Sequence, residues 1–390
     1  MKIGYLLTYF HPFKDGTENQ CLYLARVLAK RGHEIHVFTS DRRGGEIIKN
    51  KYEIYEGINI HRYRTLFRFK YYFNWNWKLM LDIMRADIDI LLVHSIGFPQ
   101  YDICLPFVKV FKKIPIVNFP HGPFWANETY PRSVKLLREL YRIFERNIVN
   151  KIYDAVIDCN GRQRFTWQPK YFPDVSKSRF IPDGMPADRY REINSSEFIK
   201  KYWLEGKFVI GQLGRLLKYK GQDQVIRALP AIVKKHPNVV FLCMGEDRGF
   251  LKELEGLASQ LGVKANVIFT GGVSEDDKLR GLDASEIFVF GSMPGTEAFG
   301  ITTLEAMARK CAVVSTKVED GHPLIEQGVN GFVYEHGDIE SLTKYLLGLI
   351  EDSASRKKMQ ELNFKRSKCY INENIALEFE ALFRKLTGKA

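Results

Sequence analysis

The sequence lacks the features that mark disulfide-rich, zinc-binding and membrane-spanning proteins. Its six cysteines are scattered and form no C-x-x-C pair, which favours neither a disulfide framework nor a zinc site and indicates a reducing compartment. No apolar run free of charge reaches the roughly 18 residues that a spanning helix needs. Low-complexity tracts and fixed-period repeats are also missing, so a mainly disordered chain and a repeat protein are excluded. The N-terminal MKIGYLL is too short for a secretory signal and predicts a buried strand.

Acidic residues are scarce in the first half of the chain. Residues 1–195 hold 31 Lys and Arg against 20 Asp and Glu, whereas residues 196–390 hold 27 against 26. Nearly all of the net charge of +12 therefore belongs to the first half. A one-sided basic field favours an anionic partner for that half, such as a membrane surface, a nucleic acid or an acidic substrate.

Short apolar runs alternate with helical patterns along the whole length, which is typical of parallel sheets buried on both faces. With 390 residues, two domains are expected. A segment rich in Pro, Gly, Asp and Ser at 181–198 separates two blocks of this pattern, so two doubly wound α/β domains facing a cleft are predicted. Strands are predicted at 2–7, 34–39, 90–95, 115–119, 154–159, 207–214, 239–245, 266–271, 286–292 and 311–316.

Two glutamates lie where one of these strands gives way to a helix. In 286–316 a strand ends at Ser292, a loop carries Glu297, and a helix predicted from about Gly300 carries Glu305 one turn in. The N–H groups at a helix N-terminus suit a phosphate, and carboxylates accept hydrogen bonds from sugar and ribose hydroxyls. The alternative for Glu305 is structural, because Thr302 and Glu305 have the spacing of a capping box.

Two cations follow another strand. In GQLGRLLKYKGQDQ (211–224), Arg215 and Lys220 stand five residues apart before a predicted helix, and together they can clamp a diphosphate. The alternative interpretation is a solvated loop.

These segments resemble glycosyltransferase family 4, the retaining nucleotide-sugar transferases of the GT-B fold. The resemblance covers most of the chain and is most specific in the second half, in GRL…KG, in EAFGITTLE and in GVNGFVYEHGD (328–338). In the first half it is looser and runs through residues 11–41, NFPHG (118–122) and RFIPDGMPADRY (179–190).

The resemblance assigns roles residue by residue. It implies that Arg215 and Lys220 bind the donor diphosphate, Glu305 the ribose and Glu297 the donor sugar, and that His121 lies near the anomeric carbon. The remaining donor contacts implied are Gly16 on the phosphates, Gly272 and Val273 near the base, and Phe299, Gly300, Ile301 and Thr302 on the phosphates and sugar. No metal and no cofactor beyond the donor are expected.

Some positions depart from the family pattern. Asp15-Gly16 replaces the paired glycines of the first loop, residues 320–324 read Asp-Gly-His-Pro-Leu without the usual glutamate, and Asp183 replaces an asparagine before glycine. Asp87-Ile88-Asp89 spells the D-x-D of metal-dependent transferases, but it precedes a strand and is interpreted as the turn that leads into it. No G-x-G-x-x-G occurs, so NAD binding has little support.

Residues 61–85 combine basic and aromatic side chains. Between 57 and 81 there are five Lys or Arg and no acid, and eight aromatics fall between Tyr63 and Trp77. This composition suits a membrane interface, and also single-stranded nucleic acid or an amphipathic core helix with basic edges. The residues assigned to an acceptor or membrane surface are Arg64, Arg68, Lys70, Trp75, Trp77 and Lys78.

The sequence therefore predicts an acceptor-binding domain at 1–190, a nucleotide-sugar domain at 191–370 and a helix at 371–390 that returns to the first domain. We expect a metal-independent hexosyltransferase of glycan biosynthesis that takes a UDP- or GDP-sugar, does not bind nucleic acid, and is cytoplasmic and peripheral at the inner face of the membrane. The expected acceptor is a lipid-linked or membrane-surface glycan. A soluble sugar acceptor, or a nucleotide-sugar 2-epimerase of the same fold, is the alternative.

Overall fold

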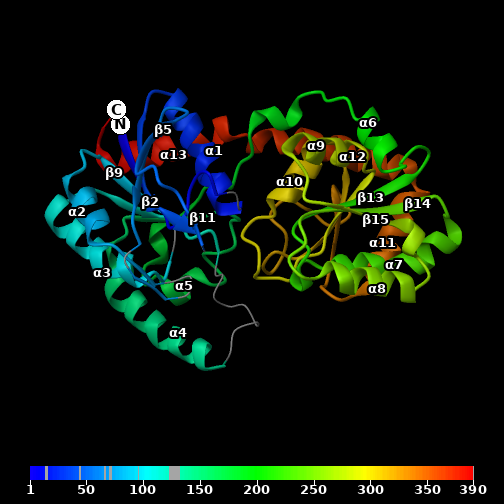
Figure 1. Cartoon of the computed structure of the whole chain (residues 1–390), viewed down its shortest axis with the longest axis horizontal. Coiled ribbons are helices and arrows are strands. Elements are labelled where there is room, and N and C mark those ends of the chain that lie inside the picture. The colour runs from blue at the N-terminus through cyan, green and yellow to red at the C-terminus, as the bar shows by residue number, and fades with distance from the viewer. Residues whose placement is uncertain are drawn as a thin grey trace. The chain divides into compact units, whose positions relative to one another are not determined.

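The computed structural model describes residues 1–13, 16–43, 45–65, 67–69, 73–94, 96–122 and 132–389. The chain divides into two compact units of similar size, Met1–Gly184 with Asn372–Ala390, and Met185–Ile371. Each contains a parallel sheet with helices, as Figure 1 shows. Within the described residues no helix combines the length and the apolar content needed to cross a bilayer.

The first unit is built on an eight-stranded sheet in the order β12-β11-β10-β9-β1-β2-β6-β5. All neighbouring strands are parallel except β5, which runs antiparallel to β6. Apolar residues on both faces of the central strands are buried, as expected for a parallel sheet. The strands are β1 (Lys2–Leu6), β2 (Glu34–Ser40), β5 (Tyr52–Tyr55), β6 (Ile58–Tyr63), β9 (Ile90–Val93), β10 (Ile116–Asn118), β11 (Ala155–Asp158) and β12 (Ser178–Phe180).

Two small hairpins and a set of helices complete this unit. The hairpins pair β3 (Arg42–Arg43) with β4 (Glu46–Ile47) and β7 (Phe67–Phe69) with β8 (Phe73–Trp75). The helices are α1 (Gly16–Lys30), α2 (Trp77–Arg85), α3 (Pro99–Phe107) with its extension η1 (Val108–Lys112), α4 (Arg132–Phe144) with η3 (Glu145–Val149) and η4 (Asn150–Ile152), α5 (Gln168–Tyr171), η5 (Val175–Lys177) and α13 (Asn372–Thr387).

Helix α13, at the end of the chain, is joined to α1 by a buried carboxylate. Glu380 accepts hydrogen bonds from Nε and Nη2 of Arg31 at 2.6 and 2.9 Å, and lies 3.1 Å from His33 Nε2. The Arg31 guanidinium lowers the pKa of Glu380 to about 2. The last helix is thus fixed to the first unit although 187 residues of the second unit, Met185–Ile371, precede it in the chain.

The second unit is built on a six-stranded parallel sheet in the order β15-β14-β13-β16-β17-β18. Alternate residues of β14 enter two cores. Phe241 and Cys243 pack with α7, α8 and α11, whereas Leu242 and Met244 pack with α6, α9 and α10. The strands are β13 (Phe208–Leu213), β14 (Val239–Met244), β15 (Val267–Gly271), β16 (Ile287–Phe290), β17 (Ala312–Thr316) and β18 (Gly331–Tyr334).

Helices therefore cover both faces of this sheet, which is the doubly wound arrangement predicted from the sequence. They are η6 (Ala187–Tyr190), α6 (Ser196–Lys201), η7 (Lys218–Lys220), α7 (Gln222–Lys235), α8 (Leu251–Gln260), η8 (Lys264–Asn266), α9 (Glu275–Asp283), α10 (Ile301–Ala308), α11 (Ile339–Glu351), α12 (Ser353–Ser367) and η9 (Lys368–Tyr370). All ten predicted strands are present, with ends displaced by no more than two residues.

Candidate functional site

The two motif segments of the second unit meet at the centre of its sheet. Strands β13 and β16 are neighbours, and the chain leaves them toward opposite edges, to β14 and to β17. Such a reversal opens a crevice at the carboxyl ends of the two strands, where ligands of α/β sheets bind. The loop after β13 carries Arg215 and Lys220, and the loop after β16 carries Glu297.

These two loops approach each other through glycine. Gly221 has a φ of +69°, and a Cβ atom there would lie 2.2 Å from the carbonyl oxygen of Gly291. A side chain at this position would separate the loops. Gln212, which is buried, donates from Nε2 to the Lys220 carbonyl oxygen (2.8 Å), and Gln224 donates to that of Gly291 (3.1 Å). The loop positions are therefore set by this close backbone approach and by two glutamine side chains that bind backbone carbonyl oxygens.

Lys220 and Glu297 form an ion pair across the two loops, and Ser292 Oγ lies 3.4 Å from the same carboxylate oxygen. The side chains keep 17% and 24% of their exposure, so both groups remain accessible to a ligand. Arg215 is half-buried, and its carbonyl oxygen accepts a 3.0 Å hydrogen bond from Gln222 Nε2. A cation and a carboxylate thus lie side by side at the end of the central strands.

Helix α10 starts beside them without a side-chain cap. Its N-cap residue is Gly300, with a φ of +88° and no side-chain hydrogen bond to the first turn. The capping-box alternative for Thr302 and Glu305 is therefore wrong, because Thr302 already lies inside the helix. Thr303 is buried, and its Oγ1 has no hydrogen-bond partner within the described residues. A helix start with this composition is suited to an anion.

His322 lies against the same helix start. A Cβ atom on Gly300 would be 3.4 Å from His322 Nε2. His322 Nδ1 accepts a 3.1 Å hydrogen bond from the Leu324 backbone N–H, which places the ring proton on Nε2, toward Gly300. No role was predicted for this histidine, although it lies in the segment 320–324 that departs from the family pattern.

The other positions predicted in this unit are at the same edge or next to it. Phe299 is buried, while Ile301 and Thr302, in the first turn of α10, are partly exposed. Gly272 and Val273 follow β15, an edge strand separated from β13 by β14. Gly272 borders the loop after β14, where Glu246 Cβ would be 3.8 Å from an added Cβ atom.

Glu305 belongs to a buried ion cluster. Its Oε1 lies 3.1 Å from Arg189 Nε and 2.6 Å from Lys278 Nζ, and Arg189 also pairs with Glu275. The side chains of Glu305, Arg189 and Lys278 are 6%, 3% and 12% exposed. Burial alone lowers the pKa of Lys278, but the Glu305 and Glu275 carboxylates raise it by more. Glu305 therefore has two cationic partners that the sequence did not indicate.

In the first unit, His121 follows β10 and is buried. Its φ is +58°, an unusual conformation for a residue other than glycine and one that recurs at functional sites. His121 Nε2 lies 2.9 Å from His94 Nδ1, and its ring stacks on Phe119 at 3.8 Å. Burial lowers the pKa of His121 to about 3, so the ring is neutral at physiological pH. Its partner His94, which follows β9 next to the central strand β1, was not predicted.

Cys21 of α1 joins these histidines, with Sγ 4.0 Å from His121 Nε2. The three possible metal-ligand atoms lie within 4.8 Å of one another. However, the 2.9 Å between the two nitrogens is a hydrogen-bond distance, shorter than the roughly 3.3 Å between two nitrogen ligands of a tetrahedral zinc ion. The geometry is that of a hydrogen-bonded histidine pair beside a thiol.

The predicted phosphate and membrane positions of the first unit are only partly described. Gly16 begins α1, and a Cβ atom there would meet nothing within 4 Å. Arg64, Trp77 and Lys78 are exposed, Trp77 by 64%. Asp15, Lys70 and the side chains of Arg68 and Trp75 lie outside the described residues. The core-helix alternative holds for α2 alone, which buries Leu79, Met80 and Ile83.

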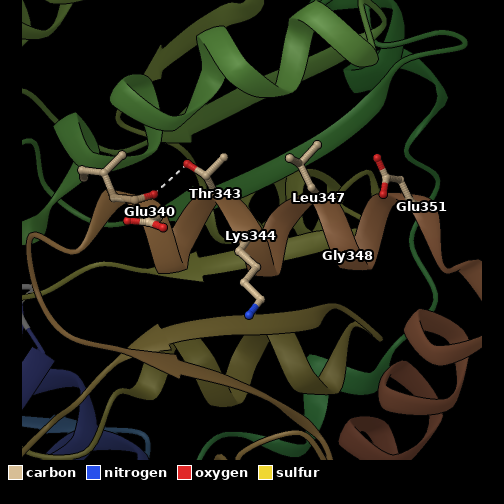
Figure 2. Close-up of a pocket in the computed structure, with 7 residues that line it drawn as sticks. Glu340, Thr343, Lys344, Leu347, Gly348 and Glu351 are labelled. Carbon is tan, nitrogen blue, oxygen red and sulfur yellow. Dashed lines mark hydrogen bonds between the residues drawn. The ribbon is translucent and has the colours of Figure 1, made fainter.

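Two other features do not belong to the site. Asp87 and Asp89 precede β9 and pair with Lys2 and Lys389, which confirms the interpretation of D-x-D as a turn. A depression of about 550 Å³ lies on the surface of α11, where the Thr343 hydroxyl donates to the Ile339 carbonyl oxygen at 2.6 Å (Figure 2). It is lined by α11 alone and contains none of the predicted residues.

Comparison with known proteins gives a family for each unit. Residues 14–189 match the model described as Glycosyltransferase Family 4, and residues 194–366 match Glycosyl transferases group 1. An uncharacterized glycosyltransferase of Methanocaldococcus jannaschii is 23% identical over 97% of both chains. The phosphatidyl-myo-inositol mannosyltransferase of Mycolicibacterium smegmatis is 25% identical over 91% of this chain and 86% of its own. The structure of HepE from Anabaena in complex with UDP has a TM-score of 0.79 at 19% identity, covers 99% of this chain and 100% of that one, and shows the GT-B fold.

Proposed function

Because the chain belongs to glycosyltransferase family 4 and is a glycosyltransferase, we propose that it moves a sugar from a nucleoside diphosphate sugar to an acceptor hydroxyl with retention of anomeric configuration. The donor is of the UDP or GDP type. One observation carries this proposal: Lys220 and Glu297 are paired where the central strands β13 and β16 end, beside the uncapped start of α10.

The residues around that pair supply what departure of a diphosphate requires. Lys220 and Arg215 neutralise the charge that develops on the leaving phosphate, and the N–H groups of Ile301 and Thr302 add hydrogen-bond donors. Glu297 accepts hydrogen bonds from hydroxyls of the transferred sugar, and Glu305 from the ribose. The acceptor attacks the same face that the diphosphate leaves, through an oxocarbenium-like transition state, and its proton passes to the leaving diphosphate.

For the first unit, the family resemblance assigns Gly16 to the donor phosphates and His121 to the transferred sugar. The neutral His121 ring, held by His94, offers a hydrogen bond without adding a positive charge next to the oxocarbenium ion. Support for a lipid-linked or membrane-surface acceptor comes from the +11 charge of residues 1–195 and from the similarity to a phosphatidyl-myo-inositol mannosyltransferase. The reaction runs without a metal, since two basic side chains and a helix start act on the leaving group.

The test is a panel of UDP-, GDP- and ADP-sugars with the purified chain. A true donor raises the melting temperature by mass action, and its sugar then appears on an acceptor with the anomeric configuration of the donor, read by NMR. Two controls separate the alternatives. Incubation without acceptor reports epimerisation of the donor sugar, and a soluble glycan as acceptor reports transfer that needs no lipid. Inversion at the anomeric carbon would contradict the proposed route.

A further inference from the structure

Helix α4 of the first unit exposes its apolar side chains. Leu136, Leu137, Leu140 and Ile143 are 65%, 67%, 59% and 52% exposed, and Ile148 in the extension η3 is 59% exposed. A surface helix of a water-soluble domain normally turns such residues toward the core. In Figure 1 this helix lies at the edge of its unit, below the labels of α3 and α5.

The opposite side of α4 is polar and is fixed to the unit by hydrogen bonds. Arg138 donates to the Gly97 carbonyl oxygen (3.3 Å), Tyr141 to Asp102 of α3 (2.6 Å), and Arg142 to the Lys170 carbonyl oxygen of α5 (2.8 Å). Glu145, one turn further on, is fully buried. The helix is therefore held with its charged side inward, and its leucines point outward as a consequence of these contacts.

The neighbouring helix exposes apolar side chains as well. Ile103 and Phe107 of α3 are 47% and 56% exposed, and Val110 and Phe111 of η1 are 62% and 68% exposed. The Phe107 and Phe111 rings stack at 6.3 Å. Helix α3 contacts the extension η3 of α4, so two adjacent helices present apolar residues. Exposed apolar areas of this extent mark an interaction surface.

The charges among these residues are mainly positive. Residues 99–122 and 136–149 hold six Lys and Arg and three Asp and Glu. Two of the three acids, Asp102 and Glu145, are buried, and the third, Glu139, pairs with Arg142 at 2.6 Å. Lys109 pairs with Asp154 at 2.6 Å, whereas Lys113 is exposed, so the surface keeps a net positive charge. A second copy of the chain would bring this basic surface against itself, because a twofold interface uses the same patch twice. Charge complementarity therefore selects an anionic partner.

We propose that the exposed apolar faces of α3–η1 and α4–η3 insert into the headgroup region of an anionic lipid bilayer. Phe, Leu and Ile enter the boundary between headgroups and acyl chains, while exposed Lys113 and the net positive charge of residues 1–195 attract the surface to lipid phosphates. The proposal rests on the proposed function, since it names the surface through which a transferase with a membrane acceptor would reach it. It differs from the sequence prediction, which placed membrane contact at residues 61–85.

The experiment is co-sedimentation of the full chain with vesicles of phosphatidylcholine alone and with 30% (about one lipid in three) phosphatidylglycerol, compared with a triple variant. Leu136→Gln, Leu140→Gln and Ile143→Gln lie on one side of α4, at positions i, i+4 and i+7. We expect wild-type protein to bind the anionic vesicles and the affinity of the variant to be lower by a factor of about ten or more. Ile54→Gln, Phe180→Gln and Leu377→Gln, equally exposed residues of the first unit on β5, β12 and α13, form the matched control and should bind like wild type.

Thermal unfolding and sedimentation velocity complete the test. The three α4 side chains are exposed, so the variant should keep the wild-type melting temperature and oligomeric state. Three outcomes would each overturn the proposal. Wild-type protein does not bind anionic vesicles, or the variant binds them as well as wild type does, or wild type is a dimer that the variant converts to a monomer. Vesicle binding needs neither donor nor acceptor. If wild type transfers no sugar but binds vesicles, and the variant does not bind them, the proposed function is refuted while the proposed membrane surface is supported.

Discussion

At the scale of single residues, the pair Lys220–Glu297 decides the chemistry. Lys220→Ala removes a preorganised positive charge from the leaving diphosphate and leaves Glu297 without its cationic partner. We expect kcat/KM to fall by a factor that corresponds to about 2–4 kcal/mol, with little loss of stability. Steady-state kinetics with the identified donor measure the change. Lys218→Ala, an exposed lysine of the same turn η7, is the matched control and should retain full activity. Unchanged kcat/KM in the Lys220 variant would refute the clamp.

Glu305 combines a ligand-binding role with a structural one. Glu305→Ala leaves Arg189 and Lys278 buried with less negative charge around them, so the chain should unfold with a free energy lower by about 2–4 kcal/mol. We also expect weaker nucleotide binding, measured by calorimetry at a temperature where the variant is folded. Glu297→Gln, in the more exposed pair, should lower turnover without this loss of stability. A Glu305 variant that is less stable but binds nucleotide normally would restrict this residue to the ion cluster.

The sequence located these residues better than it located their partners. Lys220 and Glu297 could be predicted because each follows an apolar strand, and the carboxyl ends of neighbouring strands meet. The cations on Glu305 could not be predicted, since Arg189 is 116 positions away and only the fold brings it there. His94 was missed for a similar reason: it follows a strand, but a lone histidine carries no signal until His121 is placed beside it.

At the scale of elements, strands made of continuous apolar residues could be predicted from the sequence, whereas half-exposed strands could not. β5 and β6 alternate polar and apolar residues at the sheet edge, and β7 and β8 lie in the aromatic stretch where a helix was one alternative. Helix α4 shows a different limit. Its periodicity indicates a helix, but the usual rule would turn the leucines inward, and only the contacts of Arg138, Tyr141 and Arg142 reveal the opposite orientation.

The contact between α3 and α4 should make stability depend on pH. Burial raises the pKa of Asp102 to about 7 and that of Glu145 to about 8, and the Asp102 charge contributes to the second shift, while Arg138 opposes both. Further charged or titratable groups nearby are Tyr141, Arg142, Tyr153 and Tyr171. Both carboxyls therefore stay protonated up to a higher pH in the folded chain than in the unfolded chain. The stability they contribute is complete below about pH 4 and is lost as pH rises toward 8.

Glu145→Gln tests this dependence, because the amide keeps the shape of the carboxyl and cannot ionise. We expect the variant to be more stable than wild type at pH 8 by roughly 1–3 kcal/mol, and the difference to disappear near pH 5. Urea unfolding at the two pH values measures it. Glu139→Gln, an exposed neighbour on the same helix, is the control. A Glu145 variant that is less stable than wild type at pH 8 would contradict the predicted sign.

At the scale of the whole molecule, catalysis should not depend on a divalent cation. The leaving diphosphate is proposed to be stabilised by Arg215, Lys220 and the start of α10, and the two aspartates of D-x-D are paired with lysines at the amino end of β9. Activity should therefore survive dialysis against EDTA, measured as initial rates before and after addition of Mg²⁺ or Mn²⁺. Complete loss with EDTA and recovery with either ion would show that the clamp is insufficient.

The uneven charge of the chain predicts how membrane binding responds to salt. Residues 1–195 carry +11, and exposed Arg64 and Lys78 contribute to that field. Salt shortens the screening length from about 10 Å at 0.1 M to about 3 Å at 1 M, so the electrostatic part of vesicle binding should vanish while insertion of apolar side chains persists. The double variant Arg64→Gln and Lys78→Gln should bind anionic vesicles more weakly at low salt. The binding that remains at high salt should be the same as for wild type. The α4 triple variant should bind about tenfold more weakly at low salt, where the electrostatic part remains, and lose binding at high salt. Equal binding of wild type to neutral and anionic vesicles at low salt would show that the basic field plays no part. Binding to neither kind of vesicle would make a soluble glycan the first acceptor to test.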